Sequence, residues 1–300
     1  MNAQMKYSFK KEGAYLFRTF KFLGLVLAIF GFAIANPLMY KVTGLLFKQL
    51  NANQPSATVQ VEVDPSEGGS DSIMDGLLGG MGMGDMAEMY SRADSTLMLS
   101  LVSFSSYSLL IIMLVMMSTA GGELKRRTMI VPMCSGLKFK NYLVPKFVIY
   151  PLVVFAVTFL GGLTSGGLCN ALFEEGRVGF GMIALGSLFM AIYAAFIIAI
   201  YLSLGLCTSR AGIMVGAVFL GQLFLQSTLE GMGLEDYQPF SLVTVVRNMY
   251  YEGYDLSAKL TSILVSIGLA VAIGVLMFVL ALGVLNAKKI DNQEEEKPAF

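Results

Sequence analysis

The sequence contains 300 residues, of which 55% are hydrophobic and only 14% are charged, and its formal net charge is zero. Ordinary soluble domains carry about 25% charged residues, so this composition excludes the usual soluble class and indicates a membrane protein. The chain contains no histidine, which excludes Ser-His-Asp and Cys-His catalysis and the H-E-x-x-H zinc site.

Residues 1–21 are predicted to form a cytoplasmic amphipathic helix. Phe9, Leu16, Phe17 and Phe20 share one face at the helical period, and lysine and arginine side chains occupy the neighbouring face. Such a helix can lie in the headgroup layer, where anionic lipids attract its basic side. The alternative is a basic flank that only orients the first span.

Six apolar runs without a charged residue follow this segment. They cover residues 22–40, 97–118, 147–169, 181–206, 211–229 and 260–285. Each is long enough to cross the hydrocarbon core as a helix. We therefore expect an all-α membrane protein in which residues 1–300 form a single transmembrane domain of six helices.

Basic residues gather on one side of these predicted spans. Residues 1–21, 119–146, 207–210 and 286–300 hold 15 of the 21 Lys and Arg. Cytoplasmic loops carry an excess of these residues, and an even number of spans places both termini on the same side. The sequence therefore predicts a multi-pass plasma-membrane protein with both termini, including the tail 286–300, in the cytoplasm.

The first outer loop, residues 41–96, is the longest hydrophilic section. It contains four closely spaced methionines, and soft thioethers of this kind can hold Cu(I). A mobile glycine-rich loop is the simpler interpretation, so these residues are only a weak copper candidate. They are Met81, Met83, Met86 and Met89.

The last outer segment, residues 230–258, is too apolar for a solvated loop and too short for a span. Pro239 is suited to the first position of a helix, and Gly253 could close it. We expect a short re-entrant or outer helix here, before the last span.

Two G-x-x-x-G motifs indicate close helix packing. Gly162 and Gly166 lie in the third predicted span, and Gly212 and Gly216 lie in the fifth. Small residues let helix backbones approach closely in lipid. The motif alone leaves open whether each contact lies within the chain or between two protomers.

The sequence also constrains the source of energy for any transport. No charged residue lies within the six runs, whereas proton-coupled carriers usually need such groups as relays; Na⁺ sites built from backbone groups in broken helices stay an open alternative. A P-loop requires a Gly-Lys pair, and the chain has none. Uphill transport would therefore depend on another polypeptide, and we expect this chain to be neither an ATPase nor another enzyme.

Residues 119–146, here called the basic link, join the second and third predicted spans. Ser135 is a plausible N-cap, and a helix tends to stop before a proline such as Pro145. The resulting short helix would place Phe139 and Tyr142 on one face, suited to enter a groove on a partner protein. The alternative is an ordinary positively charged cytoplasmic loop.

The basic link resembles that of the permease subunits of type-2 ABC exporters. Members of this family often show Glu, then Thr five residues on, then Pro eight further and Lys ten further. Glu123, Thr128 and Lys146 fall on this spacing, but Gly136 stands at the proline position and Arg127 replaces a common glycine. The surface helix, the large first outer loop, the short link 207–210 and the re-entrant segment also match the family pattern.

This resemblance implies that the basic link is a coupling helix that docks on a separate ATPase subunit. The implied partners are two copies of that ATPase, a second permease protomer that is identical or homologous, and membrane lipid, with no nucleic acid. The chain itself would bind no cofactor, because ATP and Mg²⁺ would sit on the ATPase. The implied coupling residues are Glu123, Lys125, Arg126, Arg127, Thr128, Ser135, Gly136, Phe139, Tyr142 and Lys146.

The expected function is thus that of an exporter permease for a hydrophobic or amphipathic cargo such as a peptide, drug or lipid. Two alternatives stay open. One is a membrane scaffold or assembly factor without transport, which would share the spans and the basic loops. The other is a copper-handling permease that uses the methionine-rich loop.

Overall fold

The computed structural model describes residues 3–18, 20–53, 88–116, 138–207, 211–232, 237–251 and 254–295. Within these ranges the protein is all-α and contains no β-strand; an isolated backbone bridge pairs Arg92 with Glu175. The predicted all-α class is confirmed for this part of the chain.

An apolar helix lies at each of the six predicted spans. Five of the six are long and apolar enough to cross a membrane, whereas the apolar part of the fifth covers only Gly212–Gln226. The chain therefore has the character of a multi-pass membrane protein, and a sixth crossing stays a prediction. The six are α2 (Lys21–Asn53), α5 (Ala93–Ser103) continued by the π-helical turn η1 (Phe104–Ser108) and α6 (Leu109–Met116), α9 (Phe139–Leu172), α10 (Phe180–Cys207), α11 (Ala211–Gly231) and α13 (Leu260–Glu295).

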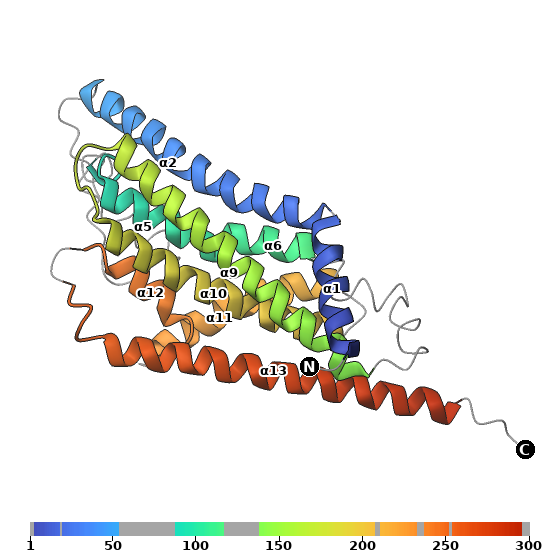
Figure 1. Ribbon diagram of the computed structural model, residues 1–300. Coiled ribbons are helices and arrows are strands. Elements are labelled where there is room, and N and C mark those ends of the chain that lie inside the picture. Colours follow the sequence, from blue (N-terminus) through green and yellow to red (C-terminus); the bar gives the residue numbers. More distant parts are fainter. Residues whose placement is uncertain are drawn as a thin grey trace, which may run out of the picture.

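Helices α9 and α10 pack along each other in the centre of the bundle, with α2 against α9 and α13 against α10 (Figure 1). The separate helix α1 (Ala3–Arg18) crosses the end of the bundle where α9 begins, and the last part of α13 extends beyond this end. We call this the basic end. The opposite end contains the end of α2, the start of α5 and the turn between α9 and α10.

Several helices extend beyond their predicted limits. Helix α2 continues from the first span to Asn53, so the first part of the predicted loop 41–96 is helical, and α13 continues into the predicted tail as far as Glu295. No proline or glycine pair interrupts 41–53, and the Lys41 ammonium donates a hydrogen bond to the Leu172 carbonyl over 2.7 Å. That bond satisfies one of the carbonyls left free at the end of α9 and holds α2 against it.

The predicted helix end before Pro145 is wrong. Helix α9 starts at Phe139 and runs through both Pro145 and Pro151 to Leu172. Prolines are tolerated inside membrane helices because neighbouring helices and polar side chains satisfy the freed backbone groups. The last part of the basic link therefore forms the first turns of a long central helix. Residues 119–137 of the link lie outside the described ranges.

The two G-x-x-x-G motifs have different surroundings. A Cβ atom at Gly162 would lie 2.5 Å from the Ser187 hydroxyl oxygen, and one at Gly166 would overlap Ile183, so this motif packs α9 directly on α10. A Cβ at Gly216 would meet nothing within 4 Å. The first motif thus serves packing within the chain, and Gly216 faces away from the described part of the bundle.

The π-helical turn η1 is stabilised from α11. A π-turn leaves backbone groups out of the regular α-helical ladder, and the Gln222 amide donates a hydrogen bond to the Ser105 carbonyl over 3.2 Å. The Tyr193 hydroxyl of α10 approaches the other side of this amide, at 3.5 Å from its oxygen. A buried polar contact therefore links three helices at mid-length.

The expected short helix before the last span is present as α12 (Ser241–Asn248). It begins two residues after Pro239, which lies in a turn, and Gly253 falls outside the described residues. Leu242 and Val246 are fully buried, and α12 packs on α10, α5 and α13. It is thus a buried part of the bundle at the opposite end; its depth in a membrane stays a prediction.

Candidate functional site

Helix α1 forms the outer layer of the basic end. Its buried stripe consists of Ser8, Glu12 and Leu16, spaced four residues apart along one face. Of the predicted apolar face, Leu16 is buried and Phe9 is half-buried, whereas Phe17 and Phe20 are exposed. A helix is therefore present here and contacts the bundle through a partly polar stripe, and its position in a headgroup layer stays a prediction.

A buried ion pair fastens α1 to α9. The Lys146 ammonium lies 3.2 Å from one Glu12 carboxylate oxygen and donates a hydrogen bond to the other, also over 3.2 Å. Lys146 is fully buried and Glu12 is 4% exposed. Removing one partner of such a buried pair typically costs about 3–5 kcal/mol, because the remaining charge stays buried without compensation.

Two tyrosines complete the surroundings of this pair. The Tyr150 hydroxyl donates a hydrogen bond to Glu12 over 3.3 Å. The Lys146 ammonium lies 5.0 Å from the centre of the Tyr142 ring and 5.9 Å from that of Tyr150, within the range of cation–π attraction. We call Glu12, Tyr142, Lys146 and Tyr150 the basic-end junction.

The junction also connects to the ends of two other helices. Tyr142 and Leu143 pack in a buried cluster with Leu206 at the end of α10 and Leu285 on α13. A more exposed contact follows on α1, where the Asn141 amide donates a hydrogen bond to the Gln4 oxygen over 3.1 Å. A displacement of the first turns of α9 would therefore act on α1, α10 and α13 together.

The structure places only the last of the predicted coupling residues. Tyr142 and Lys146 lie in the junction, and Phe139 starts α9. The others, from Glu123 to Gly136, lie outside the described residues. Tyr142 and Lys146 are both buried by contacts within the chain, so in this conformation they support the start of α9 and present no exposed surface to a partner.

Sequence reasoning missed Glu12 and Tyr150. A signal for Glu12 was available, because it is the only acidic residue among residues 1–21 and stands four positions from both Ser8 and Leu16. The pairing itself could not be read from the pattern, because Glu12 and Lys146 are 134 positions apart.

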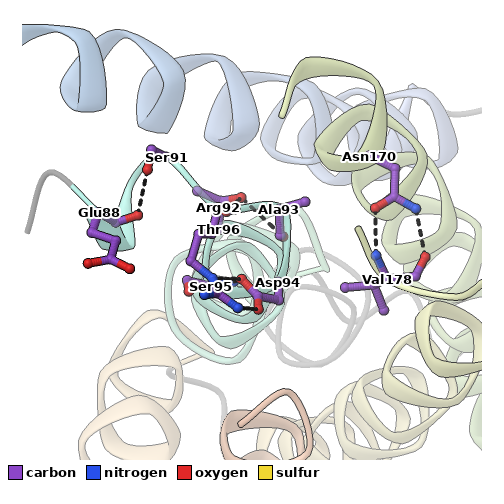
Figure 2. Close-up of polar contacts among 9 residues, drawn as sticks. All are labelled: Glu88, Ser91, Arg92, Ala93, Asp94, Ser95, Thr96, Asn170 and Val178. Atoms are coloured by element: carbon purple, nitrogen blue, oxygen red, sulfur yellow. Dashed lines mark hydrogen bonds and ion pairs between the residues drawn. The ribbon is translucent and has the colours of Figure 1, made fainter. Parts of the chain in front are cut away.

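The opposite end has its own polar contacts, drawn in Figure 2. The Arg92 guanidinium donates to both carboxylate oxygens of Asp94, over 3.2 and 2.8 Å, and Asp94 also accepts from the Ser95 backbone N–H over 2.7 Å. The Asn170 amide closes the α9–α10 turn by bonding both the carbonyl and the N–H of Val178, over 2.7 and 3.0 Å. These contacts fix the start of α5 and the turn locally.

The described residues contain no group of three or more His, Cys, Asp or Glu that could hold a metal ion. Of the methionines considered for copper, only Met89 is described, as a half-buried residue just before α5; Met81, Met83 and Met86 lie outside the described ranges. The copper alternative stays a hypothesis.

Comparison of the chain with models of protein families, with curated proteins and with solved structures finds no match.

Proposed function

We propose that this chain is the permease subunit of an ATP-driven exporter of the type-2 ABC class, in a plasma membrane with both termini in the cytoplasm. The observation that carries the proposal is the basic-end junction. It joins the basic surface helix to the first turns of the central helix through the buried Glu12–Lys146 pair. These turns form the last part of the basic link, which also contains three consecutive basic residues, Lys125–Arg127.

This arrangement suits the transmission of a push from outside the bundle. A partner that binds the basic link at residues 119–138 would act on the start of α9, and the junction would carry the displacement to α1, α10 and α13. A partner can shift a conformational equilibrium only if it binds the two arrangements of the bundle with different affinity. A rigid buried contact would keep those arrangements discrete.

The proposed partners follow from the same role. Two copies of a separate ATPase would hold ATP and Mg²⁺ and hydrolyse the nucleotide, and the chain itself would contribute no catalytic residue. A second permease protomer, identical or homologous, would complete the pathway. The outward-facing Gly216 on α11 supports this, because a small residue there permits close approach of another helix. The cargo class is hydrophobic or amphipathic.

The test is purification of the tagged chain from its native membranes in mild detergent, with quantitative mass spectrometry of co-purifying proteins and a measurement of ATP hydrolysis. We expect an ATP-binding subunit in equal amount to the chain. Glu123→Ala and Phe139→Ala should each weaken its retention or abolish the stimulation of hydrolysis by cargo. Glu174→Ala is the matched control, since it removes an exposed carboxylate at the opposite end and should change neither.

Two results would sink the proposal. One is a monodisperse, folded chain that retains no ATP-binding protein and stimulates no hydrolysis, which is the outcome expected for a scaffold or assembly factor. The other is an equal loss in Glu174→Ala and Glu123→Ala, because the effect would then have no relation to the basic end. The copper alternative is tested separately, by Cu(I) binding that disappears when Met81, Met83, Met86 and Met89 are replaced together.

A further inference from the structure

A hollow in the apolar surface lies between α9, α10 and α13, in the half of the bundle nearer the basic end. Its volume is about 450 Å³, which is within the usual range for ligand sites. Four small residues are part of the lining among bulky neighbours, namely Ala195, Ala199, Ala270 and Gly274. Phe147 and Phe278 also line it, and their ring centres are 5.2 Å apart in an edge-to-face arrangement.

The lining has no hydrogen-bonding side chain. Every residue around the hollow is Val, Phe, Pro, Ile, Ala or Gly. The helices that line it are three of the five long enough to cross a membrane, so in a bilayer the hollow would open to hydrocarbon. A flexible hydrocarbon chain fits such a hollow, whereas a polar ligand would leave its groups unpaired there.

A positive charge lies where the hollow approaches the basic end. On α9 the lining includes Val144, Val148 and Pro151, and Lys140 continues this stripe one turn closer to the helix start. The Lys140 side chain is exposed. A lysine at this position can extend toward the headgroup layer and attract a phosphate group.

We propose that this hollow is a binding site for one anionic phospholipid, with an acyl chain against Ala199 and Gly274 and the headgroup phosphate at Lys140. The charge pattern favours a lipid over a second copy of the chain. A two-fold axis along the membrane normal would bring the Lys140 residues of both copies to the same end of one interface, where like charges repel. An anionic headgroup removes this conflict.

The proposal requires only that the chain is embedded in a membrane with its basic end at the headgroups. It does not depend on an ATPase partner, so failure of the proposed function would leave it standing.

The test uses the full-length chain in mild detergent, titrated with phosphatidylglycerol or with phosphatidylcholine of the same acyl chains and read by native mass spectrometry. The wild-type chain should hold one phosphatidylglycerol in preference to phosphatidylcholine. Lys140→Gln should lower the affinity for phosphatidylglycerol about fivefold, the factor given by one lysine near an anionic surface. It should leave phosphatidylcholine unchanged, and Lys140→Arg should restore the preference.

The acyl part is tested by filling the hollow. Gly274→Leu should lower the binding of both lipids roughly tenfold or more. A Cβ at Gly274 meets nothing within 4 Å, and the same is true of Gly268 on the same helix, which does not line the hollow. Gly268→Leu is therefore the matched control and should bind as the wild-type chain does.

Three outcomes would overturn the site. The first is a wild-type chain that shows no preferred single phosphatidylglycerol, a result that does not depend on the folding of any variant. The second is equal behaviour of Gly274→Leu and Gly268→Leu. The third is a change of oligomeric state in Gly274→Leu without a change in lipid binding, which would assign the hollow to an interface between copies.

Discussion

The two ends of the bundle each contain a carboxylate paired with a basic side chain, but the pairs differ in sequence separation and in burial. At the basic end, Glu12 and Lys146 come from segments 134 positions apart, and both are buried. At the opposite end, Arg92 and Asp94 are two positions apart, and their side chains are 34% and 18% exposed. The first pair joins two helices, and the second only shapes the start of one.

This difference indicates which helices are held together by their ion pair. A partly exposed ion pair contributes about 0–1 kcal/mol because water and salt screen it. A buried pair is costly to form and costly to break, so it defines one arrangement of the helices it joins. We therefore expect α1 and the start of α9 to behave as one unit, whereas loss of the Arg92–Asp94 pair alone should cost little.

The largest expected loss in the free energy of unfolding is that of replacing Lys146. Lys146→Met leaves the Glu12 carboxylate buried without its cation and should lower the free energy of unfolding by about 3–5 kcal/mol. Arg92→Met, the matched change at the opposite end, should cost at most about 1 kcal/mol. Unfolding in mixed micelles can be followed with a thiol-reactive dye that reports exposure of the buried Cys169, with Cys134 and Cys207 replaced by serine.

The double variant Glu12→Leu/Lys146→Met sharpens this prediction. Apolar replacement of a whole buried pair is often neutral or stabilising, so most of the loss should be recovered. Losses that simply add in the double variant would contradict a direct interaction between the two residues.

The next effect concerns the packing of α9 on α10. Gly162→Ala forces a Cβ against Ser187, including its Cα atom at 3.2 Å, and should lower the free energy of unfolding by about 1–3 kcal/mol. Gly216→Ala introduces the same methyl group into open space and should change it by less than about 0.5 kcal/mol. The same micelle titration measures both, and equal losses would refute the difference between the two G-x-x-x-G motifs.

A smaller effect is expected for the tyrosine that supports the ion pair. Tyr150→Phe removes one hydrogen bond to Glu12 and should cost about 1 kcal/mol, since Lys146 still neutralises the carboxylate. Tyr201 supplies the control, because its buried hydroxyl has no hydrogen-bond partner among the described residues. Tyr201→Phe should be neutral or slightly stabilising, and a loss as large as that of Tyr150→Phe would count against the assigned role.

The smallest effect should come from the rim of the junction. The hydrogen bond between Asn141 and Gln4 is exposed, so Asn141→Ala should change the free energy of unfolding by less than about 0.5 kcal/mol. A loss comparable to that of Lys146→Met, in the same titration, would show that α1 is held by its exposed edge and not by the buried pair.

Hydropathy was sufficient to predict where the apolar helices lie, because charge-free runs of this length are stable only in an apolar environment. It was insufficient for their ends. The continuation of α2 to Asn53 depends on a bond from Lys41 to the distant Leu172 carbonyl, and the passage of α9 through Pro145 depends on its neighbours in the bundle. Local propensity carries no information about either.

The candidate site was likewise predictable from the sequence only in part. The period of α1 predicted an apolar face for the headgroup layer, but it did not reveal that Ser8, Glu12 and Leu16 form the buried stripe. The position of α1 is decided by its partner on α9, and complementary charges on two distant helices leave no periodic signal in either one. The long-range pairing of Glu12 therefore required the three-dimensional arrangement.

The central claim is that the buried Glu12–Lys146 pair makes α1 and the start of α9 one unit. Hydrogen–deuterium exchange of the wild-type chain and of Lys146→Met, in the same detergent, tests it most directly. We predict that the amides of Ala3–Arg18 are protected in the wild-type chain and exchange faster in the variant, by a factor on the order of 100, while the first turns of α5 are unchanged. Exchange of α1 that is equally fast in both proteins would contradict the claim.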